Sequence, residues 1–110
     1  MTMDTVARAL AEPTRREILA LIHGQELSVG EIAANFAVTR PAISQHLRVL
    51  QDADLVSVRS QGNRRYYQAR PEGLGELRRW LESFWRSSLA TLKVEIERDL
   101  WSETKHGSTR

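Results

Sequence analysis

TRPAISQHLRVL, residues 39–50, has the pattern of a short helix with two unlike faces. Thr39 can cap this helix through its hydroxyl, and Pro41 falls in the first turn, where a missing N–H costs little. The spacing of Ile43, Leu47 and Leu50 gives a narrow apolar stripe that must face a core. The opposite face carries side chains of the kinds that pair with phosphates and base edges, namely Arg40, Ser44, Gln45 and Arg48. The stretch therefore predicts a helix that lies in the major groove of DNA, where Thr39 and Ser44 would bind phosphates and Arg40, Gln45 and Ser44 would read base edges.

The residues before this helix predict a second helix packed close to it. Ser28 and Glu31 have the spacing of a capping box, which favours a helix over residues 29–36. Ile32 and Phe36 lie one turn apart, so we expect both to be buried. Only three residues then separate the two helices. A helix, a tight turn and a polar-faced helix make up the helix-turn-helix plan, although the usual turn glycine is absent.

Two further helices are expected upstream. The first covers residues 4–11 and ends at Glu12, because a residue that precedes proline avoids helical geometry. Glu12 then caps a second helix that starts with Pro13, and Gly24 is the expected left-handed stop. The core face of the second helix is formed by Ile18, Leu21 and Ile22.

The chain after the polar-faced helix predicts a small two-stranded hairpin. Val56 and Val58 alternate with polar residues, and the return strand is expected over Arg64–Ala69, with residues 61–63 as the turn. Asp54 lies where the chain leaves the helix, and aspartate tolerates left-handed geometry. A solubilising edge hairpin is one interpretation. The other is a wing that reaches DNA phosphates or the minor groove through its arginines Arg59, Arg64 and Arg65.

Apolar residues recur at steps of three and four from Leu74 to Leu100, which predicts one long helix over residues 74–101. The other elements are too small to cover it, so we expect a second copy of the chain to do so, with the first helix helping. Trp80, Trp85 and Trp101 could line a ligand pocket, but their helical spacing favours core or interface. The expected dimer interface comprises Val6, Leu10, Leu77, Leu81, Trp85, Leu89, Leu92 and Ile96.

Composition narrows the class of protein further. The chain has 110 residues, 41% apolar and 27% charged, which suits one soluble domain. We expect a mainly α domain over residues 1–101 and a polar tail over residues 102–110. There is no cysteine, no apolar run long enough to span a membrane and no secretion signal, so a cytoplasmic location is expected.

Positive charge is concentrated in the middle of the chain. Residues 40–70 carry six arginines and two aspartates, a net charge of +4, whereas the whole chain has a net charge of +2. Clustered arginine around a recognisable motif is the electrostatic signature of nucleic-acid binding. The alternative is a solvated surface whose charges cluster by chance.

The motifs together resemble a known family. EPTRREILALI (residues 12–22), SVGEIAANFAVTRPAISQHLRVLQDADLV (28–56) and GNRRYY (62–67) resemble the ArsR/SmtB family of winged-helix repressors. RRWLESFWRSSLATLK (78–93) resembles the branch of autorepressors without a metal site. The resemblance implies a dimer paired through its first and last helices, with the fourth helix in the major groove. It also implies that DNA is contacted by Arg40, Pro41, Ser44, Gln45, His46 and Arg48, with Arg64 and Arg65 in the wing.

Several positions depart from the family pattern or allow two interpretations. Glu12 replaces the usual aspartate, Asp54 a glycine and Ala69 a common leucine, and these changes bear on local stability more than on function. His46, beside the apolar Leu47, is either a base contact or a partly buried residue that orients the helix.

The sequence predicts no metal-binding site. Metal-binding relatives use cysteines before the recognition helix or carboxylates and histidines on the terminal helix. Here residues 30–36 contain no thiol or imidazole, and the terminal helix has carboxylates but no histidine. His23, His46 and His106 belong to different elements, whereas zinc requires about four converging ligands. We therefore expect no metal and no cofactor.

The sequence thus predicts a homodimeric repressor that binds an inverted-repeat DNA operator, without specifying its genes or any small-molecule effector. A winged-helix module that binds an acidic protein is the alternative, and a metal-responsive repressor is a weaker one. An enzyme is disfavoured, because no catalytic triad, phosphate loop or paired-carboxylate site is visible.

Overall fold

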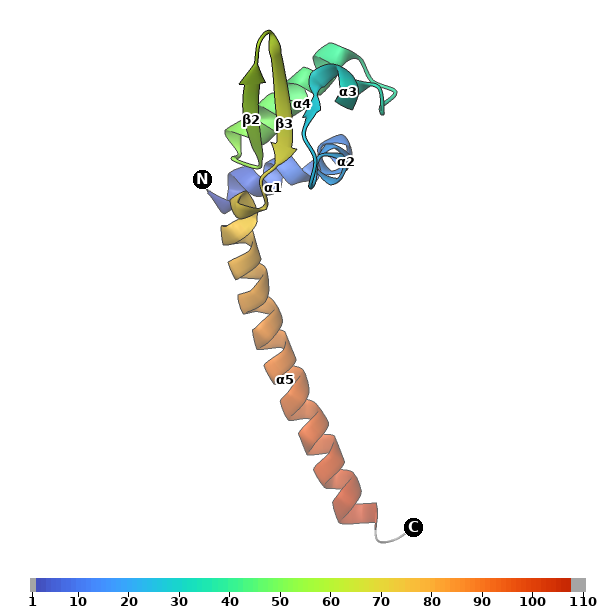
Figure 1. Ribbon diagram of the computed structural model, residues 1–110. Helices are drawn as coiled ribbons and strands as arrows, with labels where there is room; N and C mark the ends of the chain where they lie inside the picture. Colours follow the sequence, from blue (N-terminus) through green and yellow to red (C-terminus); the bar gives the residue numbers. More distant parts are fainter. Residues whose placement is uncertain (1, 108–110) are drawn as a thin grey trace. The chain divides into compact units, whose positions relative to one another are not determined.

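The computed structural model describes the backbone of residues 2–107 and the side chains of residues 2–101. The chain divides into two units, Met1–Leu77 and Arg78–Arg110, which are described separately. The elements, labelled in Figure 1, are α1 (Met3–Ala11), α2 (Pro13–Leu21), β1 (Leu27–Ser28), α3 (Val29–Ala33), α4 (Arg40–Asp52), β2 (Val56–Gln61), β3 (Arg64–Ala69), the 3-10 helix η1 (Pro71–Leu74) and α5 (Gly75–Gly107). The mainly helical class and the winged helix-turn-helix order are confirmed.

One hydrophobic core holds the first unit together. Every helix of this unit and the sheet contribute to it, so each element buries one apolar face. The core residues are Val6, Ala9, Ile18, Ile22, Ile32, Ile43, Leu47, Leu50, Ala53, Leu55, Val56 and Tyr67. The predicted stripe Ile43, Leu47 and Leu50 is therefore the face by which α4 is anchored.

The two N-terminal helices form where their caps predict. The Glu12 carboxylate accepts a hydrogen bond from the Arg15 N–H at 3.1 Å, which begins α2, and Gly24 has a φ of +79° just after that helix. One expectation needs correction. Val6 is 1% exposed and lies in the core, so it has almost no side-chain surface to offer a second chain, whereas Leu10 is half-buried.

The helix-turn-helix differs from expectation in its first half. The Ser28–Glu31 capping box is present, but α3 ends at Ala33 instead of residue 36, and six residues connect it to α4. The Asn35 side-chain amide donates to the Glu31 carbonyl at 2.9 Å, in the place of the backbone N–H that would continue the helix. The Asn35 and Phe36 N–H groups instead bond carbonyls three residues back. Phe36 was expected to be buried, but it is only half-buried against the core.

The hairpin is part of a three-stranded sheet, which corrects the two-stranded expectation. β3 lies between β2 and β1, and Leu27 of β1 pairs with Tyr67 of β3. β1 is too short to show any alternation in the sequence. The β2–β3 turn has two central residues, and the first, Gly62, has a φ of +60°, as a tight type II′ turn requires.

The junction between α4 and β2 is closely packed. Asp54 has a φ of +60°, as expected from its place at the helix end. Its carboxylate accepts from Arg70 at 2.8 Å, and the Arg70 N–H donates to the Leu55 carbonyl at 2.7 Å. A Cβ atom at Gly73 would overlap the Asp54 carbonyl oxygen, so the loop passes here only because residue 73 is glycine.

The second unit is the greater part of one continuous helix. α5 extends to Gly107, beyond the predicted end at residue 101, so the segment predicted as a polar tail is helical up to that point, and residues 108–110 lie outside the described part. Large apolar side chains on this helix remain exposed, with Leu81, Leu89 and Leu92 at 46–49%. None of the helices described is long and apolar enough to cross a membrane.

Candidate nucleic-acid interface

α4 presents a polar face because its apolar face is fully occupied. Ile43, Leu47 and Leu50 are at most 1% exposed, so rotation of the helix about its axis would expose core. The exposed side chains on the other side include those predicted to contact DNA, namely Arg40, Pro41, Ser44, Gln45 and Arg48, together with the valine Val49. Burial thus decides which side chains a DNA duplex could meet.

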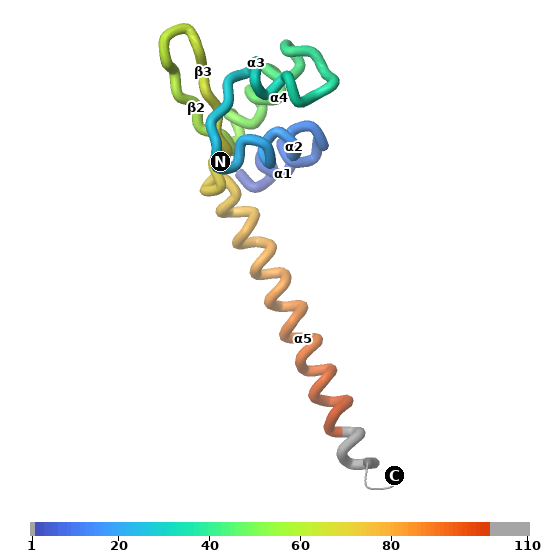
Figure 2. The backbone as a smooth tube through the Cα atoms, turned by 45° about the vertical axis from the view of Figure 1, so that its right-hand side comes forward, coloured from blue at the N-terminus to red at the C-terminus, as the bar shows by residue number. Residues whose placement is uncertain are grey.

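A groove runs between α4 and the β2–β3 hairpin, which stand beside each other in Figure 2. It has a volume of about 550 Å³ and is lined by Ser44, Gln45, Arg48, Val49, Gln51, Arg65 and Tyr67. Arg65 and Tyr67 are two residues apart on β3, so their side chains project to the same face of the sheet. The structure therefore brings three predicted residues of α4 and one predicted wing arginine to a single surface.

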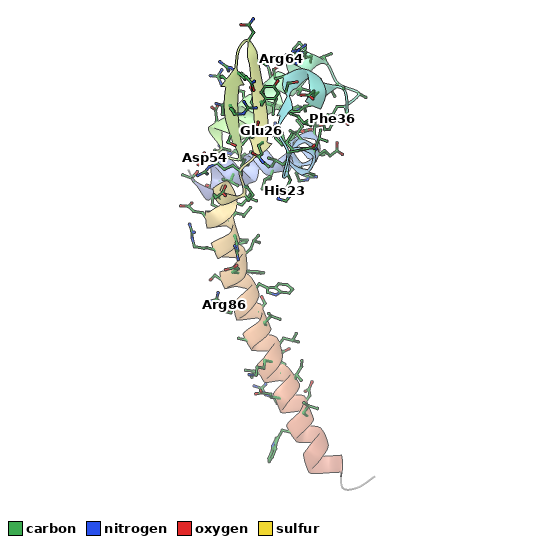
Figure 3. The ribbon with its side chains drawn as sticks, in the orientation of Figure 1. His23, Glu26, Phe36, Asp54, Arg64 and Arg86 are labelled. Carbon is green, nitrogen blue, oxygen red and sulfur yellow. The ribbon has the colours of Figure 1, made fainter. Side chains whose placement is uncertain are left out.

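A second hollow lies at the N-terminal end of α4. It is lined by Ser28, Val29, Gly30, Glu31, Arg40, Asn63, Arg64 and Arg65. Three of these side chains are guanidinium groups, and the N-terminus of a helix adds partial positive charge, so the hollow suits an anion such as a phosphate. Figure 3 labels Arg64 on the hairpin arm next to α3.

Thr39 and Glu31 show how this end of the site is built. The Thr39 hydroxyl accepts from the Ala42 N–H at 3.3 Å, so its predicted capping role is confirmed. Glu31 is held in the capping box by the Ser28 N–H at 3.0 Å. That backbone hydrogen bond, then the Ser28 hydroxyl and the nearby Arg64, lower the pKa of Glu31 below its ordinary value. The carboxylate is thus ionised beside the arginines and offsets part of their charge.

Arg59 is engaged within the sheet. Its Nε and Nη2 atoms both lie 2.8 Å from a carboxylate oxygen of Glu26, and Nη1 donates to Gln61 at 2.7 Å. Its guanidinium also covers the Tyr66 ring at 4.8 Å, and the hydrogen bond that Arg59 donates to Glu26 raises the pKa of Arg59. These contacts give Arg59 a structural role that the sequence spacing did not reveal, and its guanidinium is engaged by Glu26 and Gln61 instead of being open to DNA.

His46 lies at the edge of the polar face instead of its centre. Its side chain is 21% exposed, and Nδ1 is 3.3 Å from Arg15 Nη1 and 4.0 Å from the Glu12 carboxylate, both at the start of α2. Of the two interpretations left open by the sequence, this geometry favours an orienting residue.

Several lining residues were not predicted. Val49 and Gln51 extend the α4 side of the groove, and Asn63, in the wing turn, lines the hollow at the N-terminal end of α4. Val49 lies one helical turn after Gln45, and that i, i+4 spacing would have placed it on the same face. Asn63 offered no comparable signal, because its position depends on how the wing packs beside α3.

The residues predicted for the dimer interface divide into two groups. Leu10 and Leu77 are half-buried against the core of the first unit, and Val6 lies inside it. The other five lie further along α5, after Leu77, and have exposed fractions of 46–64%: Leu81, Trp85, Leu89, Leu92 and Ile96. Their spacing places them along one side of the helix.

In the part of the chain that the structure describes, no three His, Asp or Glu side chains lie close enough together to hold a metal ion. Arg48 is largely exposed and lies 3.8 Å from Asp52, and solvent strongly screens the attraction between these two charges.

The polar side chains of the candidate interface are arginines, amides and hydroxyls on α4 and the wing.

Comparisons with known proteins agree with this architecture. The family described as "Bacterial regulatory protein, arsR family" matches residues 12–58. HTH-type transcriptional regulator Rv2034 of Mycobacterium tuberculosis is 48% identical over 86 residues, which cover 78% of this chain and 80% of that protein. Transcriptional repressor SdpR of Bacillus subtilis is 35% identical over 82 residues, which cover 74% of this chain and 91% of that protein.

A solved structure shows the same relationship in three dimensions. The crystal structure of a possible transcriptional regulator for arsenical resistance superposes with a TM-score of 0.68 at 44% identity, covering 86% of this chain and 97% of that one. The matched proteins are transcriptional regulators, as expected for a chain without enzyme motifs. On the strength of the helix-turn-helix, the wing and these relatives, the chain belongs to the ArsR family of bacterial transcriptional regulators.

Proposed function

We propose that the protein is a homodimeric repressor of the cytoplasm that binds an inverted-repeat DNA operator. The observation that carries this proposal is the groove in which Ser44, Gln45 and Arg48 of α4 face Arg65 of the wing. SdpR, a relative over most of its length, is a repressor by name. Residues 1–101 would act as one DNA-binding and dimerisation domain.

In this proposal α4 enters the major groove. Arg40 and Gln45 read base edges, since arginine pairs with guanine and glutamine with adenine, each worth about 1–3 kcal/mol of discrimination. Ser44, Arg48 and the N-terminus of α4 hold phosphates. Thr39 and Pro41 shape the first turn of the helix, and Thr39 is already engaged as its cap.

The wing supplies affinity that does not depend on sequence. Arg64 and Arg65 are exposed and line the anion hollow, so they would meet the phosphate backbone beside the major groove. Such contacts release bound counterions, which makes the affinity fall steeply with salt.

A second copy of the chain would cover the apolar side of α5. Leu81, Trp85 and Leu89 are too exposed for a helix that acts alone in water. A twofold dimer places its two recognition helices about 34 Å apart, one turn of DNA, which is why an inverted repeat is expected.

The first experiment measures DNA binding and oligomeric state together. Purified protein is titrated into a fluorescent duplex from its own promoter at low salt, and its mass is measured by analytical ultracentrifugation. We expect a dimer that prefers this duplex to a scrambled one. A dimer that ignores DNA would favour the protein-interaction module, and a monomer would contradict the pairing proposed for α5.

The role of the wing is tested with a matched pair of arginines. Arg64→Ala should reduce the slope of log affinity against log salt by about two, since the dimer loses one phosphate contact in each of its two subunits. Arg59→Ala is the control, because Arg59 is paired with Glu26, and its slope should equal that of the wild type. Equal slopes for wild type and Arg64→Ala would remove the wing from the backbone contacts.

Direct readout by α4 is tested on a randomised operator. Gln45→Ala should relax the preference at one base pair in each half-site while leaving the others intact. Gln25→Ala serves as the control, because the Gln25 amide is engaged with the Leu21 carbonyl at the end of α2. An unchanged preference in Gln45→Ala would exclude this side chain from base recognition. Regulation itself is measured with a promoter–reporter fusion, in which deletion of the gene should raise expression.

A further inference from the structure

Arg15, at the start of α2, contacts two other helices of the first unit at once. Its Nε atom donates to the Ala9 carbonyl at 2.7 Å, and Nη2 donates to the Arg8 carbonyl at 3.2 Å. Both carbonyls lie in the last turn of α1, where helix carbonyls lack a partner. The remaining arm of the fork, Nη1, is 3.3 Å from Nδ1 of His46 on α4. One side chain therefore links the end of α1 to the recognition helix.

The chemistry of this contact determines the state of the imidazole. A guanidinium group has only donors, so Nδ1 of His46 must be the acceptor and carries no proton. The neutral ring then holds its proton on Nε2. The Glu12 carboxylate, 4.0 Å from the same Nδ1, would engage it only if that nitrogen were protonated. The Glu12 carboxylate already accepts the backbone N–H of Arg15 as the cap of α2. Glu12 therefore caps the helix, while the Arg15 guanidinium contacts His46.

The location of His46 explains why this contact matters for the orientation of α4. His46 lies between Gln45, which lines the groove, and Leu47, which is buried. Apolar packing of Leu47 and its neighbours decides which face of α4 is buried, but the hydrophobic effect is non-directional and defines the tilt of the helix less closely. A charge-assisted hydrogen bond is directional and stronger than a neutral one, so it fixes the angle at which the polar face is presented.

We propose that Arg15 is a positioning residue for DNA recognition, which acts through Nδ1 of His46 and sets the orientation of α4 relative to the end of α1. His46 then serves DNA binding as the acceptor for Arg15 and not as a contact to a base. The inference rests on the proposed DNA-binding function of α4, and its tests are chosen to fail separately from that function.

A matched pair of substitutions separates the two nitrogens. The amide oxygen of an asparagine can occupy the position of Nδ1, whereas the longer glutamine places its amide near Nε2. We expect His46→Asn to bind operator DNA within about twofold of the wild type and His46→Gln to bind about tenfold more weakly, the scale of one charge-assisted hydrogen bond partly transmitted to binding. The reverse order, or equal affinities for the two variants, would overturn the proposal.

The Arg15 side is tested with a neighbouring arginine as control. Arg15→Lys keeps the charge but cannot span α1 and His46 at once, and it should weaken DNA binding about tenfold. Arg16→Lys is matched to it, because Arg16 Nη1 donates to the Leu10 carbonyl at 2.7 Å on the same end of α1 and has no hydrogen bond to α4. Arg16→Lys should lower the thermal midpoint to a similar degree and leave DNA affinity unchanged. Equal losses of affinity in both variants would contradict the inference.

A double-mutant cycle shows whether Arg15 and His46 act through one contact. Arg15→Lys combined with His46→Gln should bind DNA no more weakly than either single variant, whereas additive losses would mean that the two residues act independently. Each variant is first shown to be folded and of wild-type mass at the concentration used.

Nuclear magnetic resonance reads the contact without any DNA. Long-range ¹⁵N–¹H spectra at pH 8 should show His46 with a proton on Nε2 and none on Nδ1, and Arg15→Lys should alter this pattern. A wild-type ring protonated on Nδ1 would refute the proposed contact. Because this readout needs no operator, a protein that fails to bind DNA would defeat the proposed function while leaving the Arg15–His46 contact open to measurement.

Discussion

The helices α4 and α5 carry similar apolar stripes, but the two stripes differ in their exposure to solvent. On α4, Ile43, Leu47 and Leu50 are at most 1% exposed, whereas Leu81, Leu89 and Leu92 of α5 are 46–49% exposed. α4 thus completes its packing within one chain, and its other face can therefore remain polar. Among the described residues of its own unit nothing covers the apolar side of α5, and the proposed dimer would provide that cover.

The largest effect expected from this comparison is in the core below α4. Leu50→Ala should lower the free energy of unfolding by about 2–5 kcal/mol, because it leaves a cavity against a fully buried face. Urea denaturation measures it. Leu92→Ala on α5 is the control, and its loss should be smallest in dilute protein and grow with protein concentration, because dimerisation stabilises the fold only above its dissociation constant. A cost below 1 kcal/mol for Leu50→Ala would show that the α4 support is looser than its burial indicates.

Gly73→Ala tests whether tight packing extends to the last residues of the first unit. The added Cβ would overlap the Asp54 carbonyl, so we expect a loss of about 1–3 kcal/mol, the usual cost of forcing extra volume into a packed site. Gly24→Ala is the companion variant, since its Cβ would meet nothing within 4 Å and only its φ of +79° is unfavourable. If the two variants unfold at the same denaturant concentration, the overlap at Gly73 is relieved by a small shift of the loop.

The exposed side of α5 is tested by its effect on dimerisation. Leu92→Ala should raise the dimer dissociation constant about tenfold, because apolar area buried twice in a symmetric interface is lost. Arg86→Ala, on the polar side of the same helix and labelled in Figure 3, should leave the constant unchanged. Sedimentation equilibrium provides both values, and equal effects would mean that the apolar side is not the pairing surface.

The smallest expected effect concerns the cap of α3. The pKa of Glu31 is lowered in the folded protein, so its ionisation stabilises the fold above its ordinary value of 4.5, and that contribution is lost as the pH falls through the lower folded value. Glu31→Gln should therefore melt below the wild type at pH 7, and the difference should close in acid. Thermal melts from pH 7 to pH 3 measure it, and a difference independent of pH would exclude the carboxylate charge as the cause.

Local features of the chain were predicted well because they depend on neighbouring residues. Thr39 caps α4, Asp54 takes a left-handed conformation and Gly24 follows α2 in the same way, each as its residue type and spacing indicated. The same is true of the polar face of α4, since the period of 3.6 residues decides which side chains oppose Leu47.

Contacts between distant segments were not predictable in this way. Arg59 has the appearance of a wing contact in the sequence, yet Glu26, 33 residues earlier, engages its guanidinium. β1 has two residues and became visible only through its pairing with β3. Val6 looked available to a partner, but the core of its own unit covers it.

The order of helices, the hairpin, the basic segment and the family membership all follow from the string of residues, because caps, turns and periodicity act over a few positions. The tertiary structure decides which polar side chains form hydrogen bonds within the protein and which remain available to a ligand. Hydrogen bonds such as that between Arg15 and His46, 31 residues apart, join segments with no local relationship, so chain order alone does not reveal them. The physical reason is that burial and pairing are properties of the assembled core, whereas helix and turn formation begin within single segments.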